Sequence, residues 1–174
     1  MPDNIGTIIS IILGSSLITA VVNHFATSYR DRRKERKELV ARANASVLRR
    51  VELCYRIRRR ASDEETEIKN LAHEIQEENE YYKSLLLVES RWYGERYSLY
   101  LVAVKKLTSE PMRRAWKVAG EPSIDMEDGI KLNHQKLEEL SRQFSQDSRR
   151  FVCPLKRSWM AIHDKIRKVK EYDL

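Results

Sequence analysis

Glycine, proline and cysteine are scarce in this chain: five, four and two of them occur in 174 residues. A sequence with so few turn residues, rich in leucine, glutamate, arginine and lysine, favours helices over strands. Cys54 and Cys153 lie far apart and show no metal-ligand spacing, so neither a zinc site nor a redox pair is predicted. The expected fold class is all-α.

Charge is absent from residues 5–22, which contain no Asp, Glu, Lys or Arg. As a helix, residues 5–25 would be about 30 Å long, the thickness of a bilayer's hydrocarbon core. The basic residues follow this apolar stretch, an order opposite to that of a signal peptide, and they predict an outside N-terminus and a cytoplasmic C-terminal part. We therefore expect a single-pass protein of the inner (plasma) membrane; a buried core helix is the alternative.

Three segments are expected from this pattern. Residues 1–25 form the transmembrane helix with a short outside N-terminus, residues 26–62 a basic juxtamembrane helix, and residues 63–174 a cytoplasmic helical domain. No Gly or Pro occurs between Val21 and Ala61, so the first helix should run from the span into a cytoplasmic helical bundle or coiled coil without a break.

Helix boundaries within the cytoplasmic part follow from its few turn and capping residues. Ser62 with Glu65 predicts a capping box that opens the second helix. Gly94 is expected to bend that helix, and the sequence 109–111 to end it. Ser123 or Asp125 is expected to cap the last helix, which proline at position 154 should kink or split.

Small and polar side chains interrupt the predicted span and divide over two helix faces. One face carries Gly6, Thr7, Ser10 and Gly14, and the other carries Ser15, Ser16, Thr19 and Asn23. Small residues let helices approach closely, and hydroxyl and amide groups hydrogen-bond across the interface. We therefore expect a homo-oligomer in which these residues pack copies together or line a central path. A dimer or trimer that packs but conducts nothing is an equal alternative.

Charge is arranged in opposite blocks beyond the span. Residues 30–60 hold thirteen Lys or Arg against four acids, whereas residues 63–80 hold eight acids against one Lys. The cations expected to contact anionic lipid are Arg30, Arg32, Arg33, Lys34, Arg36 and Lys37. Those expected to contact nucleic acid or a small anion are Arg49, Arg50, Arg58 and Arg59. Alternatively, the basic and acidic blocks pair with each other, within the chain or between copies, or both are solvated.

Catalytic patterns are absent from the sequence. There is no nucleophile–base pairing, no glycine-rich phosphate loop, and the four histidines are scattered without a second ligand at helical spacing. We therefore predict no catalytic residue, no metal site and no cofactor, and a protein that is not an enzyme.

A short outside tail, one span rich in small polar residues and a compact helical domain together resemble the small single-span membrane effectors of bacterial anti-phage defence. The resemblance implies oligomerisation, permeabilisation of the inner membrane, and control by a nucleotide or oligonucleotide ligand or a cytoplasmic regulatory protein. It assigns no role to any residue. The leading hypothesis is a pore-forming or ion-channel effector regulated through its cytoplasmic domain. The alternatives are a membrane-tethered scaffold for a soluble partner and a membrane-bound binder of nucleic acid or an anionic ligand.

Overall fold

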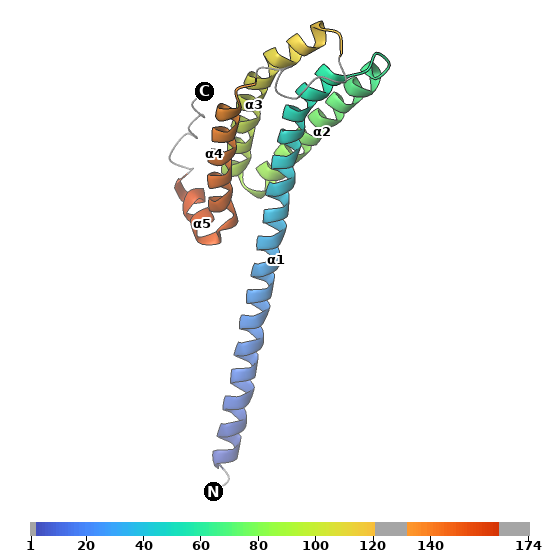
Figure 1. Ribbon diagram of the computed structural model, residues 1–174. Helices are drawn as coiled ribbons and strands as arrows, with labels where there is room; N and C mark the ends of the chain where they lie inside the picture. Colours follow the sequence, from blue (N-terminus) through green and yellow to red (C-terminus); the bar gives the residue numbers. More distant parts are fainter. Residues whose placement is uncertain (1–2, 121–131, 164–174) are drawn as a thin grey trace. The chain divides into compact units, whose positions relative to one another are not determined.

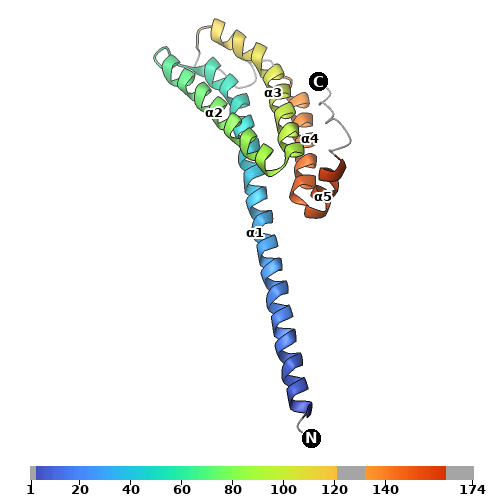
Figure 2. The same cartoon turned by 180° about the vertical axis from the view of Figure 1, so that it is seen from behind.

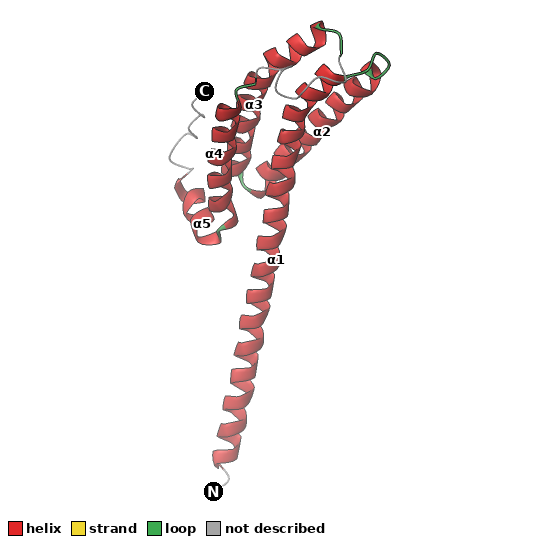
Figure 3. Ribbon diagram, in the orientation of Figure 1, coloured by secondary structure: helices red, strands yellow, loops and turns green. Residues whose placement is uncertain are grey.

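The computed structural model describes residues 3–120 and 132–163; the side chains of residues 3–17, 154, 160, 161 and 163 lie outside that description. Its elements in chain order are α1 (Asp3–Arg59), α2 (Glu65–Glu89), α3 (Arg91–Lys117), α4 (His134–Val152) and α5 (Pro154–His163) (Figure 1). No strand occurs in these ranges, as the colouring in Figure 3 makes plain. The predicted all-α class and helical bundle are therefore confirmed.

The chain divides into two compact units, Met1–Glu38 and Leu39–Leu174. Helix α1 contributes to both, and its continuity agrees with the absence of helix-breaking residues between Val21 and Ala61. Among the residues it describes, the structure has no helix both long enough and apolar enough to cross a bilayer. The predicted span falls largely on residues 1–17, whose side chains lie outside the described part, so it stays a prediction.

The second unit is a bundle in which α1 and α2 are antiparallel neighbours. Arg49 of α1 forms an ion pair with Glu78 of α2 at 2.6 Å, and one helical turn earlier Ser46 donates a hydrogen bond to Asn79. Arg49 of the basic block and Glu78 of the acidic block thus pair within the chain, in the antiparallel arrangement that was one of those predicted from the opposite charges. Helix α3 packs against both α2 and α4, and α5 folds back against α4 (Figures 1 and 2).

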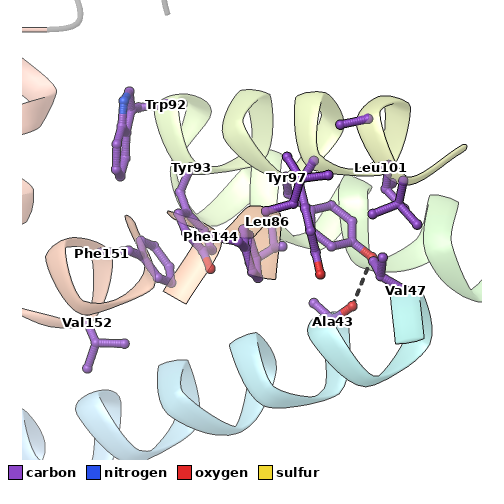
Figure 4. Packing of buried hydrophobic residues seen from close by; sticks show 14 residues of the cluster. Ala43, Val47, Leu86, Trp92, Tyr93, Tyr97, Leu101, Phe144, Phe151 and Val152 are labelled. Atoms are coloured by element: carbon purple, nitrogen blue, oxygen red, sulfur yellow. Dashed lines mark hydrogen bonds between the residues drawn. The ribbon is translucent and has the colours of Figure 1, made fainter. Parts of the chain in front are cut away.

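Two apolar clusters form the core of this unit. The larger one is built around stacked aromatic rings of α3 and α4, which Figure 4 shows at close range; Tyr93 and Phe151 stack with ring centroids 4.3 Å apart. The smaller one joins α1, α2 and the end of α3 through residues that include Leu53, Ile57 and Ile75. The helix-spaced apolar residues of the sequence therefore mark the core.

The break between the second and third helices lies at Ser90 rather than at Gly94. Ser90 is extended (φ −162°, ψ 114°), and its hydroxyl accepts a hydrogen bond from the Tyr93 amide, which caps α3. Gly94 has a packing role instead, because a Cβ there would lie 2.6 Å from Leu87 Cα. The expectation of a bend at Gly94 was wrong because the cap at Ser90 ends α2 one turn earlier.

Other predicted boundaries also shift. Ser62 does not cap α2: the helix begins at Glu65 after Glu64, with no side-chain cap bond. Helix α3 continues through Pro111 to Lys117, because Ala115 is buried in the smaller cluster and Met112 and Trp116 pack against that cluster. The chain does break before residue 154, as its proline predicts. The predicted caps at 123 and 125 lie outside the described residues.

Candidate functional site

Helix α1 carries an exposed apolar row followed directly by cations. The row repeats at three- and four-residue steps, which places its members on one face. Its members are Ile18, Val21, Val22, Phe25 and Tyr29. In the following turns Arg30, Arg32, Arg33, Lys34 and Lys37 are exposed, and Arg36 is half-buried. An apolar row that ends in a dense cationic segment has the chemistry of a helix passing from lipid to anionic headgroups.

The residues predicted to pack or line the span are described only in part. Gly6, Thr7, Ser10, Gly14 and Ser15 lie on α1, in the part whose exposure and contacts are not described. Thr19 and Asn23 are both exposed on α1. The predicted packing of this segment against copies of itself stays a prediction.

The four arginines proposed as anion contacts do not converge on one site. Arg49 pairs with Glu78 on α2, while Arg50, one position later, donates a hydrogen bond to Thr108 on α3 at 3.2 Å. Burial lowers the pKa of Arg50 from its usual value. Arg58 donates a hydrogen bond to the Ala119 carbonyl at 3.0 Å.

Arg59 is half-buried on the last turn of α1. Arg49 and Arg50 therefore contact neighbouring helices, and Arg58 contacts the chain just beyond α3. The role of these four arginines as anion contacts stays a prediction.

Arg60 is not among the four arginines predicted as anion contacts, and it holds the end of α3. Its guanidinium donates hydrogen bonds to the carbonyls of Ala115, Trp116 and Val118, and it lies 4.8 Å above the centroid of the Trp116 ring. These carbonyls belong to the last turn of a helix, where they lack partners within the helix itself. No sequence signal marks this contact, because the two partners are more than fifty positions apart.

A second exposed apolar row lies on α5. Leu155, Trp159 and Ile162 are 84%, 62% and 67% exposed and are spaced like one face of a helix. We call these three residues the α5 face. In the sequence the same apolar spacing continues to residue 169, and the scaffold hypothesis uses this row as a docking surface for a soluble partner. The structure leaves the described part of that row exposed.

Burial keeps the Cys54 thiol and the Tyr97 hydroxyl of the bundle protonated. Burial raises the pKa of the Cys54 thiol to about 11, with a smaller opposing effect from Arg50. A thiol in this state is a poor nucleophile at neutral pH. Burial also raises the pKa of Tyr97. Among the described residues, no group of His, Cys, Asp and Glu is placed to hold a metal ion.

No protein-family model, curated protein or solved structure matches this chain. Two surfaces of the described residues bear on function, the apolar and basic side of α1 and the α5 face. Both combine exposed apolar side chains with nearby cations.

Proposed function

We propose that this chain is a single-pass protein of the inner membrane that self-associates through its N-terminal helix and forms or gates an ion path there. In this proposal the N-terminus lies outside and the helical bundle lies in the cytoplasm. The bundle transmits control from a regulatory protein or a nucleotide ligand. The single observation that supports the proposal most is the uncharged stretch 5–22, continued by exposed apolar side chains up to Phe25 and then by the cations of 30–37.

Self-association is supported by the small and polar residues of the predicted span. Gly6, Ser10 and Gly14 recur every four residues, a spacing that lets two helices approach closely. Lipid tails gain nothing from contact with hydroxyl and amide groups, so Thr7 and Asn23 are better accommodated against another copy or along a water-filled path. An anchor without partners would not need them.

The test is ion flux through liposomes that contain the purified full chain. We expect flux from the unaltered chain, and its loss in Gly14→Leu, which fills the site of close helix approach. Leu13→Ile is the matched control, because it keeps the volume and apolar character of the neighbouring position. A chain that stays monomeric in mild detergent, or that never conducts after reconstitution, refutes the proposed ion path.

A membrane-tethered scaffold is the second candidate, and the exposed α5 face favours it. In that function the N-terminal helix only anchors the chain, and the bundle holds a soluble partner. Replacing residues 5–22 with a polyleucine span separates the two candidates. A scaffold keeps its activity after the swap, whereas an ion path is lost.

A further inference from the structure

Helix α5 is fixed to the bundle in one orientation by Arg157. Its guanidinium donates hydrogen bonds to the Glu89 side chain at 2.9 Å and to the Glu89 carbonyl at 2.7 Å. It also lies 5.6 Å from the centroid of the Phe151 ring. Because Arg157 ties one side of α5 to the α2–α3 turn, the α5 face of Leu155, Trp159 and Ile162 remains exposed.

This end of the bundle is basic. Residues 82–96 and 146–157, which form it, hold seven Lys or Arg against three acids. All three acids are paired with cations of the same region: Asp147 with Arg96 at 2.8 Å, Glu89 with Arg157, and Glu95 with Arg91. Arg149 and Lys156 are exposed. A row of leucine, tryptophan and isoleucine among exposed cations is the composition of helices that lie in the headgroup layer of anionic membranes.

We propose that the α5 face binds the headgroup–acyl boundary of an anionic bilayer, the same bilayer in which the proposed span is anchored. The inference rests on the proposed membrane anchorage but not on ion conduction. Tryptophan is the side chain best suited to this layer, because its ring is apolar and its N–H can remain hydrated. Cations nearby add about 1 kcal/mol each when they approach anionic lipid.

A bilayer fits this face better than a second copy of the chain does. Two copies that met through their α5 faces would bring two basic bundle ends together, and like charges repel. The predicted span and the α5 face also belong to one chain, so anchorage of the span makes contact between the α5 face and the bilayer an intramolecular event.

The experiment measures quenching of tryptophan fluorescence by brominated acyl chains in vesicles that contain the full chain. Trp159 is one of three tryptophans; Trp92 is buried and Trp116 is half-buried beneath Arg60. In vesicles of phosphatidylcholine with phosphatidylglycerol we expect brominated lipid to remove up to about a third of the emission. Trp159→Phe should abolish that loss, and the matched control Trp116→Phe should retain it.

Two further comparisons test the lipid chemistry. The quenching should weaken in pure phosphatidylcholine vesicles and with Leu155→Glu, which places an acid beside Trp159. Equal quenching in the unaltered chain and in Trp159→Phe overturns the inference, as does crosslinking of Ile162→Cys to a second copy in place of quenching. If the chain fails to float with vesicles at all, the proposed anchorage is wrong. If it floats but Trp159 is not quenched, only the α5 inference is wrong.

Discussion

Removal of the Tyr97 hydroxyl measures how much the buried polar cluster between α1, α2 and α3 contributes to stability. Tyr97 is fully buried, and its Oη lies 3.1 Å from Ser46 Oγ, 3.2 Å from Asn79 Oδ1 and 3.2 Å from the Ala43 carbonyl, the last contact drawn in Figure 4. Tyr97→Phe keeps the ring and therefore opens no cavity. We expect it to lower the free energy of unfolding by about 1 kcal/mol, the net value of one hydrogen bond.

The expected loss is small because Ser46 can still donate to the acceptors that Tyr97 contacts. Ser46 Oγ lies 2.8 Å from the Ala43 carbonyl and 3.0 Å from Asn79 Oδ1, so it can donate to either acceptor after Tyr97 loses its hydroxyl. Asn79→Leu is different, because it removes the amide oxygen that accepts hydrogen bonds from both Ser46 and Tyr97. At about 1 kcal/mol for each hydrogen bond lost, Asn79→Leu should destabilise the bundle more than Tyr97→Phe.

Thermal unfolding in one detergent, followed by circular dichroism, compares the two variants and their combination. A loss of 1 kcal/mol lowers Tm by about 4 °C in a domain of this size. The double variant should lose less than the sum of the single variants, because both changes disrupt one cluster. If Tyr97→Phe is as stable as the unaltered chain, or less stable than Asn79→Leu, this assignment of donors and acceptors is wrong.

Three further predictions concern the charges and thiols of the bundle. Burial raises the pKa of Cys54 in the folded chain from 9.0 to about 11, so the stability that the protonated thiol contributes is complete below pH 9 and is lost as pH rises through 11. The free energy of unfolding should therefore fall by about 2 kcal/mol by pH 11, and this fall should be absent in Cys54→Ala. Cys153 is half-buried and should react with a thiol reagent before Cys54; equal rates in the folded chain would contradict this. Asp147→Ala leaves the 14%-exposed Arg96 side chain without its carboxylate and should lower the free energy of unfolding, measured by chemical denaturation, by about 3 kcal/mol. Arg96→Met combined with Asp147→Leu should lower it less.

The helical class and the core could be predicted from the sequence because both depend on local periodicity. Val47, Cys54 and Ile57 are separated by seven and three residues, which places them on one helix face, and all three are buried. The opposite charges of residues 30–60 and 63–80 likewise favoured the antiparallel pairing that Arg49 and Glu78 make.

Helix ends and buried polar contacts were harder to predict because they depend on partners distant in the sequence. Pro111 remains inside α3 because burial of the following turn outweighs the loss of one backbone donor. Asn79 interrupts the apolar face of α2, which is a visible signal of a buried polar contact, but its partners Ser46 and Tyr97 lie on other helices. The sequence alone does not show that these three meet.

The cations of residues 30–60 fall into two groups when their contacts are compared. Several cations from Arg49 onward form contacts within the bundle: Arg49 pairs with Glu78, Arg50 donates a hydrogen bond to Thr108, and Arg60 donates to the carbonyls at the end of α3. Those of residues 30–37 are mostly exposed. An anionic partner binds side chains whose donors are accessible and gains little from those already engaged within a bundle. Residues 30–37 are therefore the better surface for anionic lipid, and a nucleic acid that bound residues 49–60 would have to displace contacts that the bundle itself needs.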